Sequence, residues 1–147
     1  MTKPNLQLAH GIAVDTNGKI YIVANTENVL KTFYPNGQRA TPSFTRGLNS
    51  PSAIALGPDG KLYIANFLAV GTYTPEGQRI QPNFIHIGGD GGPATATAVA
   101  VDADGSIYAG YYSVGGGHGA AVVFSPDGKQ LNPAIIVPDG VSGIAVH

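Results

Sequence analysis

The chain contains no cysteine, and only 12% of its 147 residues are charged. Without cysteine it has no disulfide framework, no cysteine-based zinc site and no thiol chemistry. A net charge of −1 without any basic run gives no electrostatic footprint for nucleic acid. No apolar run approaches the roughly 18 residues of a membrane-spanning helix, and residues 1–10 lack the apolar segment of a signal peptide. We expect a soluble chain with no nucleic-acid or membrane partner, either cytoplasmic or extracellular with its signal removed.

Glycine and proline are abundant instead, with 21 and 11 copies, or about 22% of the chain. Both residues destabilise helix interiors, which leaves little room for long helices. Hydrophobic residues reach 43%, so the chain can bury a core within the length of one ordinary domain. This composition predicts an all-β fold of short strands joined by tight turns.

A short apolar motif followed by a turn recurs along the chain. It begins at Gly11, Ala53, Ala98 and Gly143, at intervals of 42, 45 and 45 residues. In the first three copies an Asn-Gly or Asp-Gly turn follows, and then a strand that has Ile-Tyr or Leu-Tyr near its start. A second turn motif then appears, at 34–38, 74–78 and 125–129. Two turns and two apolar runs in fixed order predict four antiparallel strands per unit, which is the blade of a β-propeller.

We therefore divide the single domain 1–147 into three blade repeats at about 10–51, 52–96 and 97–140, with an extra copy of the first strand at 141–147. The expected second strands are 19–24, 61–65 and 106–110, and the expected third strands are 29–34, 70–74 and 120–124. Looser fourth strands are expected at 39–44, 79–85 and 130–137.

The motif Gly-Ile-Ala-Val-Asp-x-x-Gly-x-Ile-Tyr, followed by Tyr-x-Pro-x-Gly, resembles the NHL and SMP-30-like propeller repeats. The third repeat, with Gly88–Gly92 ahead of its apolar motif, is also similar to the SBBP-type repeat of bacterial propellers. The resemblance covers about 9–147 and implies the fold. Propellers of these kinds include binding modules, lactonases, lyases and scaffolds, so it does not imply one function.

Three blades cannot close a ring, because propellers have four to eight blades. Alone they leave two apolar blade faces open. We expect a second identical chain to complete a six-bladed ring as a homodimer, with a homotrimer of nine blades as the other closed assembly. The fourth copy, 143–146, then competes with 11–14 of the next chain for one innermost position. Either one copy is displaced, or the C-terminal strand completes a neighbour's blade by strand exchange.

The resemblance implies a place for a divalent metal at the mouth of the central channel. Asn25 and Asn66 follow the second strands, where such ligands could project, and Glu27 is the nearby acid. The third repeat has Gly110 and Tyr111 there, and the axial carboxylate of the SMP-30-like enzymes is missing. We therefore expect no metal and no cofactor, with the two asparagines capping strand ends.

Other candidate residues surround the expected axis. His10 and His147 flank copies of the first strand and could bind an anion or metal in a ring of several chains, while Tyr111 and Tyr112 could stack on a sugar. The Asp-x-Asn-Gly turn at Asp15 lacks the Gly and Glu positions of a calcium loop, so we interpret it as a hairpin turn. No nucleophile elbow or other catalytic set is present.

These observations favour a non-enzymatic binding or scaffold module that self-associates to close a ring, with an unknown small-molecule or protein ligand. One alternative is an SMP-30-like metal-assisted hydrolase or lactonase. Another is a fragment, or an engineered part, of a larger propeller. Bound metal near the channel mouth separates the enzyme from the binding module.

Overall fold

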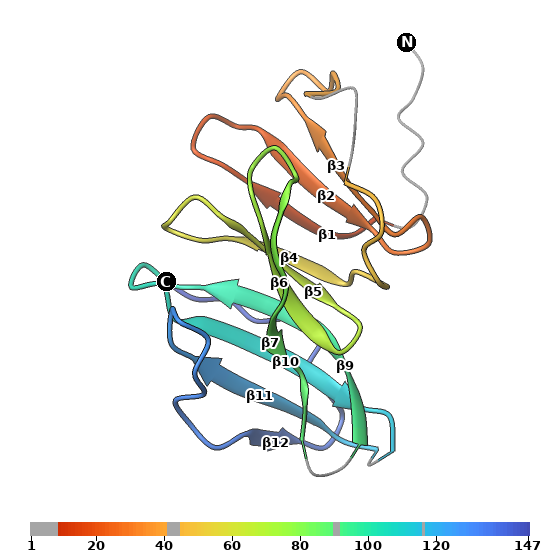
Figure 1. Cartoon of the computed structure of the whole chain (residues 1–147), viewed down its shortest axis with the longest axis vertical. Helices are drawn as coiled ribbons and strands as arrows, with labels where there is room; N and C mark the ends of the chain where they lie inside the picture. Colours follow the sequence, from red (N-terminus) through yellow and green to blue (C-terminus); the bar gives the residue numbers. More distant parts are fainter. Residues whose placement is uncertain (1–8, 41–44, 90–91, 116) are drawn as a thin grey trace.

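The computed structural model describes residues 9–40, 45–89, 92–115 and 117–147, which form strands and turns without a helix. It follows that no helix of this described part is long and apolar enough to cross a membrane. The strands form three antiparallel sheets that follow one another along the longest axis of the molecule (Figure 1). Each sheet corresponds to one sequence repeat, and we call them blades 1, 2 and 3.

Blade 1 contains three strands in the order β1-β2-β3. They are β1 (Ala9–Val14), β2 (Ile20–Ala24) and β3 (Val29–Phe33). Beyond β3, single bridges join Phe33 to Arg39 and Leu30 to Thr45. The expected fourth strand at 39–44 falls largely on residues 41–44, which lie outside the described residues.

Blade 2 has the four antiparallel strands that the repeat predicts, in the order β4-β5-β6-β7. They are β4 (Ala53–Leu56), β5 (Leu62–Asn66), β6 (Ala69–Tyr73) and β7 (Arg79–His86). Every residue of β5 and β6 is buried, as expected for strands with a blade on each side.

Blade 3 has the order β12-β11-β10-β9, and the two-residue β8 (Gly88–Gly89) pairs with the start of β9. Its strands are β9 (Gly92–Val101), β10 (Ile107–Ser113), β11 (Gly119–Phe124) and β12 (Ile135–Val137). The fourth strand is shorter than the expected 130–137, and a single bridge joins Phe124 to Gln130. Residues 141–147, the extra copy of the first strand, form no strand.

The turn that joins the first two strands of each blade is closed by an aspartate. Asp15 Oδ1 accepts the backbone N–H groups of Asn17 and Lys19, each at 2.9 Å, and its Oδ2 accepts the hydroxyl of Tyr21 at 3.2 Å. Asp102 makes the same three bonds in blade 3. These carboxylates are engaged within the turn, as in the hairpin interpretation.

In blade 2 the turn begins with Gly57, so the carboxylate comes from a different position. Asp59, two residues later, accepts the N–H of Lys61 at 3.1 Å and the hydroxyl of Tyr63 at 3.1 Å. The tyrosine partner is kept although the aspartate has moved. The carboxylate–tyrosine bond is thus common to all three blades.

Two hydrophobic cores hold the blades together, and each lies between neighbouring blades. The first joins Tyr21, Val23 and Leu30 of blade 1 to Ile54, Leu62, Ile64 and Tyr73 of blade 2. The second joins Tyr63, Val70 and Ile85 of blade 2 to Val99, Ile107, Val122 and Phe124 of blade 3. A blade is therefore stable only with a neighbour packed against it.

The innermost strands β1, β4 and β9 approach one another very closely. A Cβ added at Gly11 would lie 2.8 Å from Ala53 Cα and 3.0 Å from Ile54 N. No side chain fits at Gly11 between these backbones, and the other repeats have only the small Ala53 and Ala98 at this position. The small motif residues thus set the spacing of the blades around the axis.

The aspartate–tyrosine pairs predict a specific alkaline titration. Burial, together with the nearby charges of Asp15 and Asp59, raises the pKa of Tyr21 and of Tyr63 to about 12. The folded state therefore favours the neutral phenols. Their contribution to stability is fully present below the ordinary pKa of 10.0 and is lost as pH rises towards about 12.

We expect spectroscopic titration to show Tyr21 and Tyr63 ionising near pH 12, with the denaturant midpoint falling between pH 10 and 12. Tyr63→Phe should remove one of the late ionisations. Tyr34→Phe, at an exposed position, should leave both in place. Ionisation of Tyr21 and Tyr63 at the ordinary pKa of 10.0 would contradict the assignment.

Candidate functional site

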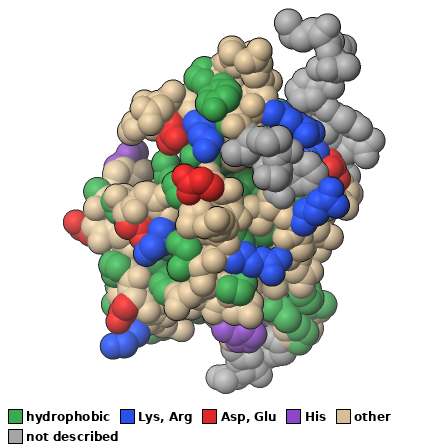
Figure 2. Space-filling view, turned by 45° about the horizontal axis from the view of Figure 1, so that its top comes forward, with side chains coloured by type: hydrophobic (Ala, Val, Ile, Leu, Met, Phe, Trp, Pro, Cys, Tyr) green, Lys and Arg blue, Asp and Glu red, His purple; other side chains and the backbone are tan. Residues whose placement is uncertain are grey.

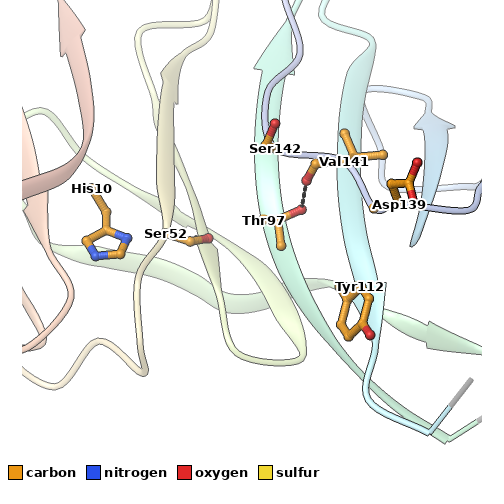
Figure 3. Close-up of a pocket in the computed structure, with 8 residues that line it drawn as sticks. His10, Ser52, Thr97, Tyr112, Asp139, Val141 and Ser142 are labelled. Carbon is orange, nitrogen blue, oxygen red and sulfur yellow. Dashed lines mark hydrogen bonds between the residues drawn. The ribbon is translucent and has the colours of Figure 1, made fainter. Parts of the chain in front are cut away.

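A polar pocket lies where the innermost strands begin. It has a volume of about 450 Å³ and is lined by His10, Ser52, Thr97, Tyr112, Asp139, Gly140, Val141 and Ser142 (Figure 3). Four of these residues hold one repeat position, directly before the small apolar motif: His10, Ser52, Thr97 and Ser142. The sequence repeat therefore brings four polar side chains to one end of the propeller axis.

Two hydroxyls of the pocket connect neighbouring blades in the same way. Ser52 Oγ donates to the carbonyl oxygen of Ala96 at 2.6 Å, and Thr97 Oγ1 donates to the carbonyl oxygen of Val141. Ala96 and Val141 each directly precede the next copy of this repeat position. Since each hydroxyl uses its proton on a backbone, its remaining lone pairs can only accept from a ligand.

Blade 1 departs from this pattern because His10 stands where the other repeats have a hydroxyl. The carbonyl of Pro51, the counterpart of the Ala96 carbonyl, accepts a bond from Asn25 Nδ2 at 3.3 Å instead. The imidazole of His10 is exposed on the pocket wall and can both donate and accept a hydrogen bond.

The opposite wall carries Tyr112 and Asp139 (Figure 3). Tyr112 belongs to β10 and is exposed, whereas Asp139 comes from the loop after β12. The wall thus offers an aromatic face and one carboxylate to whatever enters the pocket. Together with the hydroxyls and the imidazole, these groups suit a small ligand rich in hydroxyl groups.

The other predicted binding residues do not join this pocket. Tyr111, the neighbour of Tyr112 on β10, points to the other side of the sheet and lines a second cavity of about 390 Å³ with His86, Phe124 and Gln130. His147 aligns in the repeat with Asp15 and Asp102, which start the turns after the innermost strands. The C-terminus indeed lies at the edge that carries these turns (Figure 1). His10 and His147 are therefore at opposite ends of the innermost strands.

The three metal candidates have other partners. Asn66 is 4% exposed, accepts the N–H of Asn49 at 3.3 Å and donates to the carbonyl of Ile64 at 3.2 Å. Asn25 donates to Pro51, and Glu27 forms an ion pair of 2.6 Å with Lys31. Within the described residues, no three His, Asp or Glu side chains are grouped to hold a metal ion. These donor groups do not fit a divalent-metal site.

Sequence reasoning missed Ser52, Thr97, Ser142 and Asp139 as pocket residues. The repeat alignment itself held the signal for the first three, because they occupy the position of His10. The charged groups show no comparable concentration. Lys and Arg side chains are scattered over the face in Figure 2, with acidic groups among them.

Comparison with known proteins supports the fold and its partial extent. No family model matches the chain, and no curated protein matches it. Among solved structures it is similar to virginiamycin B lyase from Staphylococcus aureus (TM-score 0.65, 18% identity), covering 95% of this chain and 45% of that one.

It is also similar to a gluconolactonase from Xanthomonas campestris, with a TM-score of 0.69, 18% identity and coverage of 97% of this chain and 52% of that one. A third similar structure is a calcium-binding protein, regucalcin, from Agrobacterium tumefaciens. Its TM-score is 0.67 and its identity 16%, and the match covers 90% of this chain and 44% of that one. The chain thus spans about half the length of these structures. At such identities the likeness shows the fold alone, and the described chain is a three-bladed part of a β-propeller.

Proposed function

We propose that this chain is a non-enzymatic binding module that forms a six-bladed ring with a second copy of itself and binds a small polar ligand at the mouth of the axis. The observation that carries the proposal is the exposure of one repeat position. Ile12 in blade 1 is 64% exposed, whereas its counterparts Ile54 and Val99 are each 7% exposed. The preceding blade covers Ile54 and Val99, whereas the described residues contain no blade that covers Ile12.

The same face of blade 1 exposes Val14, which is 55% exposed. Burial of one such side chain contributes roughly 1.5–3 kcal/mol, so an uncovered blade face favours association. Because β1 repeats the sequence of β4 and β9, we expect this face of blade 1 to pack against a preceding blade as blades 2 and 3 do. A blade of a second copy is the partner that this repeat chemistry fits.

The comparison lengths support six blades. Three blades of this chain correspond to 52% of the gluconolactonase chain, which leaves room for about six blades in all. A second copy supplies the missing three, and rotation about the ring axis closes the assembly. The alternative source is further sequence of a longer chain, which would complete the ring without a partner.

The mass in solution separates these two sources. We expect a species of twice 15.0 kDa at micromolar concentration, because two apolar blade faces become buried on closure. Sedimentation velocity with multi-angle light scattering measures it. A mass of three copies would indicate a nine-bladed ring, and a 15.0 kDa species at every concentration would contradict self-closure.

The pocket supports binding rather than catalysis. The hydroxyls of Ser52 and Thr97 donate their protons to backbone carbonyls. Within the described chain no hydrogen bond joins either hydroxyl to the imidazole of His10 or the carboxylate of Asp139, as a nucleophile–base pair would require. His10, Tyr112 and Asp139 offer hydrogen bonds and one aromatic face. Monosaccharides have the matching chemistry, and calorimetric titration with a set of them is the direct test.

We expect Tyr112→Ala to weaken the monosaccharide bound by the pocket by about tenfold, since the aromatic face on this wall is lost. Tyr34→Ala, at an exposed position outside the pocket, is the matched control and should leave the affinity unchanged. Equal weakening by both substitutions, or by neither, would contradict the assignment of the pocket.

The metal-assisted hydrolase remains the second candidate function because the similar structures include a gluconolactonase. For this chain we expect no acceleration of gluconolactone hydrolysis by Ca²⁺, Mn²⁺ or Zn²⁺. Asn66→Ala should lower the free energy of unfolding by about 1–3 kcal/mol, because it removes the hydrogen bonds of a buried side chain to the backbone of Asn49 and Ile64. Asn25→Ala, at a less buried position, should cost less.

Denaturant titrations with and without each metal ion check this expectation. Metal-dependent hydrolysis that Asn25→Ala or Asn66→Ala abolishes would favour the enzyme. A stability loss that is the same with and without metal supports the structural role of both asparagines.

A further inference from the structure

Residues 141–147, which we call the tail, lie where the innermost strand of a fourth blade would begin. Thr97 Oγ1 donates to the carbonyl of Val141 (Figure 3). Ser52 Oγ donates to the carbonyl of Ala96 in the same way. Ala96 leads into the innermost segment of blade 3. By the same register, Val141 leads the tail into the innermost position of a blade after it.

Blade 3 is shaped to receive the start of the tail. A Cβ added at Gly110 of β10 would lie 2.5 Å from Cγ1 of Val141. One added at Gly119 of β11 would meet the backbone of Gly140. The counterparts of Gly110 in blades 1 and 2 are Val23 and Ala65, so the tail packs more closely on its blade than a side chain at this position would allow.

The tail and β1 have complementary burial, although both contain Gly-Ile-Ala-Val. In the tail Ile144 and Val146 are half-buried, while Gly143 and Ala145 are exposed. In β1 the pattern is reversed, with Ile12 and Val14 exposed and Gly11 and Ala13 half-buried. In a blade with a neighbour on each side, the innermost strand packs against both neighbours. In β4, for example, Ile54 faces blade 1, and Ala53 and Ala55 face blade 3.

The tail also lacks a strand partner, since none of its residues lies in a strand or bridge. In blade 1 the partner of the same tetrapeptide is β2, with Ile12 opposite Ile22 and Val14 opposite Ile20. The tail of another copy can make this ladder with the same side chains. An unpaired segment of strand-forming sequence is a template for such pairing.

We propose that the tail of one copy forms the innermost strand of blade 1 of a second copy by pairing with its β2, and that β1 of the second copy leaves the sheet. The proposal rests on closure of the ring by two copies and names the strand that closes it. Each copy gives its tail to the other, so the exchange occurs twice in the ring.

The tail of one copy and β1 of the other compete for the innermost position of blade 1. The tail has an advantage because its first residues already lie against blade 3 of its own chain. Val141 contacts Thr97 and Gly110 of blade 3 of the same chain before any second copy arrives, and Ile144 and Val146 are then already half-buried. A β1 strand from another copy would first have to expel them. Release of β1, by contrast, loses a ladder that the tail then restores residue for residue, and Ile12 and Val14 were uncovered beforehand.

A matched pair of substitutions tests the exchange on the full chain. Ile144→Asp places a charge on the buried face of the tail and should weaken dimerisation by about 100-fold or more, since the interface occurs twice. Ile12→Asp changes the same residue of the same tetrapeptide in the released strand and should leave the dimer constant nearly unchanged. Sedimentation equilibrium measures both.

A reversible lock gives an independent test, made simple by the absence of native cysteine. Val14→Cys with Ile20→Cys joins β1 to β2 at paired positions. Oxidation should hold the protein as a monomer, and reduction should restore the dimer. Val146→Cys with Ile20→Cys should instead give covalent dimers on oxidation.

The outcomes distinguish the exchange from the ring itself. Dimers that survive the oxidised lock, or that Ile12→Asp disrupts as much as Ile144→Asp does, would overturn the exchange while leaving ring closure intact. Insensitivity to both aspartates would overturn it as well. An unsubstituted chain that is monomeric at every concentration would refute ring closure first.

Discussion

Burial of the innermost strand between two blades is the constraint on which this structure depends. The isoleucine or valine of each apolar motif faces the preceding blade, and the alanines face the following one. A strand so used needs neighbours on both sides. Blade 2 alone has both within the described chain, and Ile54 of its innermost strand is 7% exposed, whereas Ile12 of blade 1 is 64% exposed.

The same close approach creates the pocket. Because glycine and alanine let neighbouring backbones nearly touch, the residue before each motif comes within hydrogen-bond reach of the next blade. Ser52 and Thr97 use that reach to tie one blade to the next. Their hydroxyls therefore connect blades and line a cavity at once, so substitutions at either would alter stability and binding together.

Much of the fold could be predicted from the sequence, since turns, strand periodicity and repeat length all act locally. The aspartate–tyrosine bonds illustrate the limit. The repeat shows that Asp15 and Asp102 are equivalent, and each accepts the hydroxyl of a tyrosine. In blade 2 Asp59 accepts the hydroxyl of Tyr63 instead, which only the structure shows because Asp59 holds a different repeat position. Likewise β12 is shorter than expected because the sequence after Gln130 has no strong strand pattern.

The candidate site was harder to predict because its residues share a position and not a chemical type. A histidine, two serines and a threonine give no motif, so His10 was noticed and its three counterparts were not. Tyr111 and Tyr112 were equally plausible until strand alternation placed them on opposite sides of β10. Asn25 looked like a ligand, yet it substitutes for the missing hydroxyl in blade 1 by bonding to Pro51.

Closure of the ring and ligand binding are therefore coupled in this molecule. His10 lies beside β1, and Ser142 opens the tail, so the two candidate closing strands both carry a residue of the pocket. If the tail replaces β1 of another copy, Ser142 takes the position of that copy's His10, and the ring of groups around the axis becomes one of hydroxyls. If β1 stays, the imidazole remains. The strand that completes the blade thereby decides which chemistry the channel mouth presents.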